Sequence, residues 1–366
     1  MPQLDQLTAQ LDRLAQFEPS PFPVVSVYLD LRADDRGRDR FEPFLRKEMT
    51  ERVATYPAGG PERASLAADR RRIEEYVRNI DPSSNGLALF ACDGAGLFEA
   101  VQLAAPIDAH RLYISDEPHL YPLARVLDRH PRYVVLFTDT HSARIFVFAA
   151  NAVEKTKSIE SPKAKHHKVG GMSQARYQRH TENYHLHHAK EVVDAVARIM
   201  RDEGIDRLIL SGDEVIVPLL REQMPKDVAA RIVDVVRLEA HAGEREILET
   251  TLAALQAKDA GTDRERVDAL MAAYRASGLA CVGVEATKRA LELGQVDELV
   301  IAATPGAITG VKSAAGDVQP ERTASERAAD ELIAHARRTS AKIRFVEDAA
   351  LLASAGGVGA FLRFKV

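Results

Sequence analysis

The chain has few of the features that mark secreted, membrane or metal-dependent proteins. It holds two cysteines in 366 residues, Cys92 and Cys281, and both lie in apolar segments, so we expect small core residues rather than a disulfide framework. No apolar run approaches the roughly 20 residues that a membrane-spanning helix needs. The first residues, MPQLDQLTAQLDRL, lack the apolar core of a signal peptide. We therefore expect a cytoplasmic protein with no membrane partner.

Common catalytic signatures are also absent. The sequence contains no HExxH, CxxC or GxSxG pattern, and no GxGxxG after a predicted strand. GAITGVKS, from Gly306 to Ser313, has one residue between its last glycine and its lysine, so it is not a phosphate-binding loop. His185 and His188 are three residues apart and can share a helical face, but two ligands do not make a zinc site. We expect no cofactor and no metal ion.

One segment reverses the charge of the chain, whose formal net charge is -5. Residues 163–190 read KAKHHKVGGMSQARYQRHTENYHLHHAK, with four Lys, two Arg and six of the twelve His against one acidic residue, Glu182. Such local positive charge favours a polyanionic partner, although a solvated loop is the alternative. Gly170 and Gly171, at its centre, let the backbone approach another molecule closely or turn with positive φ.

The residues after the two glycines are predicted to be helical. Apolar residues recur further on at helical spacing, which predicts a face packed on a core and a stop at Gly204; they are Val192, Val193, Ala195, Val196, Ile199 and Met200. Between Ser173 and Lys190 polar residues surround the helix, so this half is expected to project. With Ser173 as cap, roughly 30 residues at about 1.5 Å each carry the tip about 45 Å from the far end. A long basic arm with a bare tip favours RNA as the partner.

These residues resemble a known family. GGMSQARYQRH, followed by ENYHLHHAKEVVDAV, resembles the catalytic loop and next helix of the archaeal and eukaryotic class-1 peptide release factors, in which a Gly-Gly-Gln tip precedes a Ser-Ala-x-Arg-Phe-x-Arg run. It is also similar to their bacterial and archaeal relatives, to Pelota and to the Vms-type peptidyl-tRNA hydrolases. Their middle domain resembles YVVLFTDTHSARIFVFAANAV and DRLILSGDEVIVPLLREQMPKDVAARIV, and their C-terminal domain resembles GVEATKRALELGQVDELVIA and GGVGAFLRFKV. The resemblance spans Arg132 to Val366.

The tip differs from that of the release factors. Met172 stands where they have Gln directly after the second Gly, and the nearest Gln is Gln174, two residues later. A thioether cannot position a water molecule, whereas an amide can, and the Vms-type enzymes also carry their functional Gln later in the motif. A shift of two residues turns a helical side chain by roughly 200°. Gln174 is therefore expected to reach the substrate if the tip is unwound there.

The resemblance implies hydrolysis of the ester between a nascent peptide and the terminal adenosine of tRNA. It implies that the backbone of Gly170 and Gly171 approaches the ester and that Gln174 orients the attacking water. The side chains expected to bind ribosomal RNA flank this tip: Lys163, Lys165, His166, His167, Lys168, Arg176, Arg179 and His180. The expected partners are the ribosome, through rRNA and peptidyl-tRNA, and, by resemblance alone, a translational GTPase bound by the C-terminal domain.

The order of predicted elements indicates an α/β protein with three α/β domains, at residues 1–128, 129–237 and 238–366. In the first, a charged connection from Phe41 to Tyr56 precedes a helix from Pro61 to Asn79. The middle domain is predicted to be a mixed sheet with helices, ribonuclease H-like by resemblance. The C-terminal domain is predicted to be an α/β/α sandwich, ribosomal-protein-like by resemblance.

The expected function is peptide release from peptidyl-tRNA in ribosome rescue. One alternative is a non-catalytic factor that occupies the same ribosomal site in rescue or hibernation; Met172 favours it and Gln174 opposes it. The other is cleavage of the tRNA 3′ end. Asp139, at the end of a predicted strand, is interpreted as a turn former, since no second carboxylate is paired with it as in a nuclease. Stop-codon reading is not supported, because the first domain lacks an Asn-Ile-Lys-Ser motif.

Overall fold

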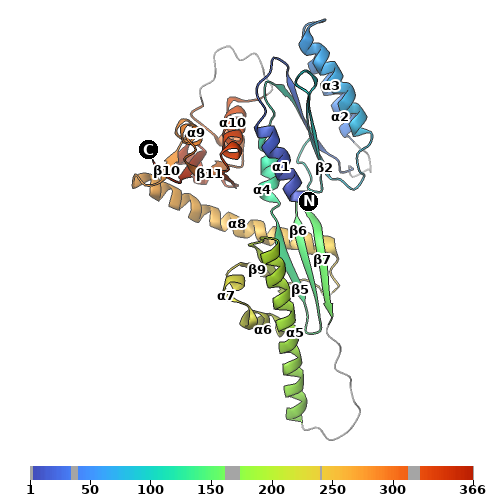
Figure 1. The fold of residues 1–366 in the computed structure, drawn as a ribbon, viewed down its shortest axis with the longest axis vertical. Coiled ribbons are helices and arrows are strands. Elements are labelled where there is room, and N and C mark those ends of the chain that lie inside the picture. The colour runs from blue at the N-terminus through green and yellow to red at the C-terminus, as the bar shows by residue number, and fades with distance from the viewer. Residues whose placement is uncertain (1–2, 34–39, 161–173, 240, 312–321, 366) are drawn as a thin grey trace. The chain divides into compact units, whose positions relative to one another are not determined.

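The computed structural model describes residues 3–33, 40–160, 174–239, 241–311 and 322–365. Helices alternate with strands that form three sheets, which confirms the predicted α/β class (Figure 1). The chain groups into two compact units. The larger combines Gln3–Arg129 with Ala260–Val366, and the smaller is His130–Asp259. Each segment predicted as a domain contributes one sheet, while the three-domain division itself stays a prediction.

The first sheet belongs to the larger unit and is antiparallel, in the order β3-β2-β1-β4. Its strands are β1 (Val24–Asp30), β2 (Gly86–Cys92), β3 (Leu97–Leu103) and β4 (Arg111–Ser115). The helices of this segment are α1 (Gln3–Ala15), α2 (Phe41–Ala54), α3 (Pro61–Val77) and α4 (Tyr121–Arg129). The central strands β1 and β2 are buried along almost their whole length, as their nearly continuous apolar sequences require.

Helix α2 occupies the segment predicted as a charged connection, so that prediction was wrong. Its buried residues Leu45, Met49 and Val53 recur every four residues and therefore share one face, which packs on the first sheet. The charged residues between them hide this stripe in the sequence. Helix α3 agrees with the prediction and begins at Pro61, because proline lacks an N–H that the first helical turn would leave unpaired.

The smaller unit is built on a five-stranded mixed sheet in the order β7-β6-β5-β8-β9. Its strands are β5 (Tyr133–Thr138), β6 (Ser142–Ala149), β7 (Ala152–Glu160), β8 (Leu208–Gly212) and β9 (Ile232–Val236). The first three are antiparallel, while β5, β8 and β9 run parallel. Its helices are α5 (Gln174–Asp202), α6 (Ile216–Gln223) and α7 (Lys226–Ala229). The predicted mixed sheet is confirmed.

Alternation along β5 directs side chains to both faces of this sheet. Val134 and Leu136 join a core with α5 and α6 on one face. Tyr133 and Val135 join a second core on the other face, closed by the first half of the long helix α8 (Glu244–Arg275). The hydroxyl of Tyr133 hydrogen-bonds to Thr251 of α8 at 3.0 Å. Helix α5 is therefore held by a sheet that is packed on both sides.

The third sheet belongs to the larger unit and has the order β10-β13-β11-β12. Its elements are β10 (Ala280–Val282), α9 (Val284–Glu292), β11 (Val296–Ala302), α10 (Ala324–Arg338), β12 (Lys342–Val346) and β13 (Val358–Leu362). The second half of α8 covers one face through Val267 and Leu270, and α9 and α10 contact β11. This layering agrees with the predicted α/β/α sandwich. Among the described helices, none is both long and apolar enough to cross a lipid bilayer.

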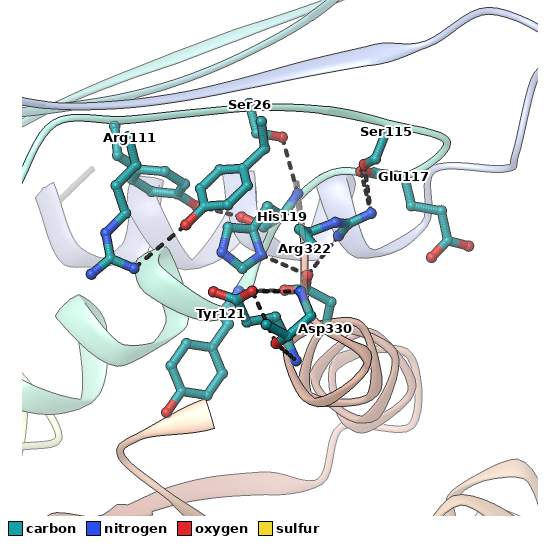
Figure 2. A network of polar contacts seen from close by, with 12 residues as sticks. Ser26, Arg111, Ser115, Glu117, His119, Tyr121, Arg322 and Asp330 are labelled. Atoms are coloured by element: carbon teal, nitrogen blue, oxygen red, sulfur yellow. Dashed lines mark hydrogen bonds and ion pairs between the residues drawn. The ribbon is translucent and has the colours of Figure 1, made fainter. Parts of the chain in front are cut away.

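A buried polar network lies inside the larger unit, centred on Asp330 of α10 (Figure 2). Its carboxylate lies 2.6 Å from Nδ1 of His119 and accepts a hydrogen bond from the Tyr121 N–H at 2.8 Å. It also forms an ion pair with Arg322 at 2.6 Å, and the same guanidinium donates to the hydroxyl of Ser115. His119, Arg322 and Asp330 are each no more than 6% exposed. The carboxylate thus has several donors in place of water.

The network fastens the first sheet to α10 within the larger unit. The N–H of His119 donates to the hydroxyl of Ser26 on β1 at 3.0 Å, and its ring lies 4.3 Å from that of Tyr113 on β4. His119 and Asp330 are 211 residues apart in the sequence. Helix α10 begins with a capping box, in which the Thr323 hydroxyl and the Glu326 carboxylate each accept a backbone N–H. Polar residues here have a structural task.

Candidate nucleic-acid interface

Helix α5 has two halves with different surroundings. From His188 onward it packs on the sheet, and the stripe predicted from Val192 to Met200 is confirmed as buried or partly buried. The helix ends at Asp202, and Gly204 follows with a φ of +64°, as predicted for a glycine stop. Its first turns run past the ends of the strands (Figure 1). One half is therefore an anchor and the other a projection.

The predicted site residues fall on both sides of the point where α5 begins. Gly170 and Gly171 lie outside the described residues, as do the predicted RNA contacts Lys163, Lys165, His166, His167 and Lys168. Gln174 is the first residue of α5, and Arg176, Arg179 and His180 follow in its first turns. Spacings of three and four residues place Arg176, Arg179 and His180 at neighbouring positions on one side of the helix. The predicted RNA contacts that belong to α5 are therefore neighbours in its first turns.

The turn between β5 and β6 is fixed by Asp139. Its Oδ1 accepts the N–H groups of His141 and Ser142, each at 2.7 Å, and its Oδ2 accepts the Ser142 hydroxyl at 3.1 Å. Burial raises the pKa of this carboxyl, but these hydrogen bonds outweigh burial, so the pKa lies below its ordinary value. The interpretation of Asp139 as a turn former is confirmed.

His188 connects this turn to the anchored half of α5. Its side chain is buried, and its ring hydrogen-bonds to the backbone of Ser142. Burial lowers the pKa of His188, which keeps the imidazole neutral at physiological pH. His188 therefore belongs to the core of the smaller unit. In the described part of the chain no three His, Cys, Asp or Glu side chains gather as a metal site would require.

Three aromatic rings meet where the turn faces α5. We call His141, Tyr184 and His185 the ring cluster; the ring centroid of His141 lies 5.8 Å from that of Tyr184 and 5.9 Å from that of His185. His141 is exposed and the other two are half-buried. No local sequence pattern marks these three residues as a set, although they stand in the turn between β5 and β6 and in the His-rich segment 163–190. Their meeting depends on the sheet, which no local pattern reveals.

Sequence comparison shows that two segments of the chain are related to the archaeo-eukaryotic peptide release factors. Residues 118–256 match the profile of bacterial archaeo-eukaryotic release factor family 10, and residues 262–366 match that of eRF1 domain 3. The first match contains the whole mixed sheet with α5, and the second contains the third sheet. The predicted resemblance to the release-factor family is thereby confirmed.

Individual relatives come from bacteria and archaea. Protein Rv2629 of Mycobacterium tuberculosis is 26% identical over 302 residues, which cover 79% of this chain and 77% of that protein. Peptide chain release factor subunit 1 of Methanopyrus kandleri is 26% identical over 212 residues, which cover 56% of this chain and about half, 51%, of that factor. Among solved structures, archaeal termination factor aRF1 aligns at 17% identity and a TM-score of 0.28, over 99% of this chain and 98% of that chain. Archaeal Pelota, from a model of ribosome-bound Pelota and ABCE1, aligns at 17% identity and a TM-score of 0.44, over 99% of this chain and 94% of that chain.

Proposed function

We propose that the protein is a ribosome-associated factor that releases a nascent peptide by hydrolysing the peptidyl-tRNA ester. One observation carries this proposal. Within the segment that matches the release-factor profile, the Gly170-Gly171 pair stands shortly before a projecting helix, which begins at Gln174. Only Met172 and Ser173 separate the second glycine from this glutamine. Bare backbone and a water-orienting amide are therefore close neighbours in the chain.

In the proposed reaction the oxygen of a water molecule attacks the carbonyl carbon of the ester. The bond to the ribose oxygen of the terminal adenosine breaks, that oxygen takes up a proton, and a free peptide acid and deacylated tRNA remain. Backbone N–H groups of Gly170 and Gly171 stabilise the negative charge that develops on the carbonyl oxygen. The amide of Gln174 accepts a hydrogen bond from the attacking water and so fixes its direction.

Ribosomal RNA is the proposed binding partner of the basic side chains around the tip. Arg176, Arg179 and His180 occupy one side of α5, and the lysines at 163, 165 and 168 with His166 and His167 precede the helix in the chain. Contacts of Lys and Arg with phosphates fix register and orientation without reading sequence. A tip that must meet one particular ester needs this kind of fixed register.

The C-terminal segment suggests a second partner. Residues 262–366 match eRF1 domain 3, and their α/β/α sandwich is folded around its own core of β11, β12 and α8 residues. We extend the proposal to a translational GTPase bound by this segment, as the resemblance to the release factors implies. Co-purification of such a GTPase with the full-length chain is the expected result.

The catalytic proposal is tested with ribosomes that carry a labelled peptidyl-tRNA. Wild type should release the peptide, whereas Gln174→Ala and Gly171→Ala should release it at least about tenfold more slowly, because positioning of water and backbone is lost. Gln178→Ala, one turn further along the same helix, is the matched control and should release at the wild-type rate. Equal rates for Gln174→Ala and Gln178→Ala would remove Gln174 from the mechanism.

Met172 favours the main alternative, a factor that occupies the ribosomal site without catalysis. In the same assay such a factor would bind ribosomes and release nothing, and Met172→Gln, which restores the glutamine of the release factors, would then be the variant that gains release. Cleavage of the tRNA 3′ end is recognised separately, because it shortens the tRNA, whereas ester hydrolysis leaves its length unchanged.

A further inference from the structure

The ring cluster lies where the turn between β5 and β6 meets α5, and its residues are exposed or half-buried. His141 is exposed, and Tyr184 and His185 are half-buried, so each ring presents part of its surface to solvent. The ring centroids of Tyr184 and His185 are 6.2 Å apart, so no two of the three centroids are further apart than this distance. Core residues begin only at His188, three positions beyond His185. The cluster is therefore an aromatic surface beside the core.

Both elements that carry these rings are held firmly. The backbone N–H of His141 is bound by Asp139, and the Thr138 hydroxyl donates to the Ser142 carbonyl at 2.9 Å, so the turn has little freedom. Buried His188 joins the Ser142 backbone to α5, one turn from Tyr184. Rings that are already fixed lose little conformational entropy when a ligand stacks on them.

We propose that the ring cluster is a stacking site for an unpaired RNA base. The proposal rests on the proposed function, since it takes the partner of this face to be RNA, and it adds base contacts to the phosphate contacts assigned above. Histidine and tyrosine rings are common platforms for unstacked bases. The same helix supplies Arg176 and Arg179 at its start, so a strand whose phosphates meet these cations passes along the element that carries the rings.

The charge beside the cluster favours a base over a phosphate. Asp139 lies in the same turn as His141, and its hydrogen bonds hold its carboxyl in the charged form at neutral pH. A phosphate at this position would meet that negative charge, whereas the face of a base is uncharged. Stacking also tolerates any sequence, because every base has a π-face. The rings and the cations thus recognise different parts of one strand.

The test uses two fluorescent single-stranded RNAs of equal length, one of mixed sequence and one with the same backbone but no bases. The full-length wild type should bind the base-bearing strand about fivefold or more tightly than the abasic strand. His141→Ala and Tyr184→Ala should reduce this preference, with thermal melting used to confirm that each variant is folded. His141→Phe and Tyr184→Phe, which keep a ring, should retain it.

Two further variants distinguish an effect of charge from an effect of stacking. His141→Lys adds a cation without a ring and should lose the base preference, and His187→Ala, an exposed histidine outside the cluster, should keep it. The proposal is overturned if His141→Lys retains the preference for the base-bearing strand while His141→Phe loses it. It is also overturned if wild type binds both strands equally. Base-dependent binding in a protein that releases no peptide leaves the stacking site standing and refutes the catalytic function.

Discussion

Two regions of this protein are rich in polar side chains, and they differ in where their hydrogen bonds go. In the network around Asp330, the carboxylate is surrounded by His119, Arg322 and a backbone N–H, all buried in the larger unit. In the projecting half of α5, the described residues Asn183 and His187 face solvent. Polarity alone therefore does not mark an interface. Polar groups that are satisfied inside the protein hold it together, and those that face outward are available to a partner.

Only one of these two regions could be recognised in the sequence. Residues 163–190 are contiguous, so their charge and glycine content stand out. His119, Arg322 and Asp330 are scattered over more than 200 positions, and each is ordinary in its local context. The partners of a buried charge are distant in the sequence, so no local sequence pattern reveals the network.

The largest effect is expected from Arg322→Met, which removes the cation and keeps the aliphatic stem. Asp330 then stays buried without its strongest partner, so the free energy of unfolding of the larger unit should fall by about 3–5 kcal/mol. Urea unfolding followed by circular dichroism measures this loss. The matched control is Glu331→Gln, next to Asp330 on α10, which breaks a partly exposed ion pair with Lys288 of α9 and should change stability by less than about 1 kcal/mol.

Equal losses in Arg322→Met and Glu331→Gln would mean that the buried network contributes no more than a surface pair. A third variant, Asp330→Asn, keeps the shape of the side chain and removes its charge. It should also destabilise the larger unit, because the buried Arg322 then keeps only Asp116, a mostly exposed carboxylate 3.6 Å away, as an acidic partner.

Asp69 differs from Asp330 in that it is a buried carboxylate without a network of this kind. It accepts the N–H of Asp93 at 2.8 Å, but burial, with the nearby Asp93 carboxylate adding to it, raises the pKa of Asp69 to about 7. The folded protein therefore keeps a proton that the unfolded chain releases between about pH 4 and 7. In this window a rise in pH favours the unfolded chain, so stability should fall by about 2–4 kcal/mol.

Asp69→Asn tests this directly, since an amide can keep the hydrogen bond from Asp93 and carries no charge. The variant should unfold at higher urea concentration than wild type at pH 8, and the difference should shrink or reverse at pH 5. Parallel pH profiles for the two proteins would show that Asp69 does not titrate in this range.

Local patterns predicted the parts of the fold that repeat at short range. The stripe from Val192 to Met200 marked the anchored half of α5, and apolar runs marked the central strands. Helix α2 was missed, because Leu45, Met49 and Val53 stand among many charged residues and only the packed sheet selects their face. Periodicity is a reliable guide only where one face is strongly apolar.

The candidate site was predictable to the same extent. Gly170, Gly171 and the basic residues were visible as a contiguous motif, although the glycines lie outside the described residues. The ring cluster was not visible, because His141 and Tyr184 are 43 positions apart and meet only through the packing of α5 on the sheet. Sequence reveals a site on one segment more easily than a site between segments.

The smallest effect on stability, and the clearest on binding, is expected from neutralising the start of α5. The double variant Arg176→Gln, Arg179→Gln should leave the free energy of unfolding unchanged and weaken ribosome binding. It should also reduce the slope of log affinity against log salt concentration by about 2, because each lost phosphate contact lowers this slope by about 1. The matched control is Arg198→Gln with Arg201→Gln, which has the same spacing on the anchored half, where both side chains are exposed. If both pairs reduce the slope equally, ribosome binding depends on the total charge of the protein, and the projecting half of α5 is not the binding surface. If only the first pair does, position along one helix separates the anchor from the interface, because each pair removes two positive charges at the same spacing.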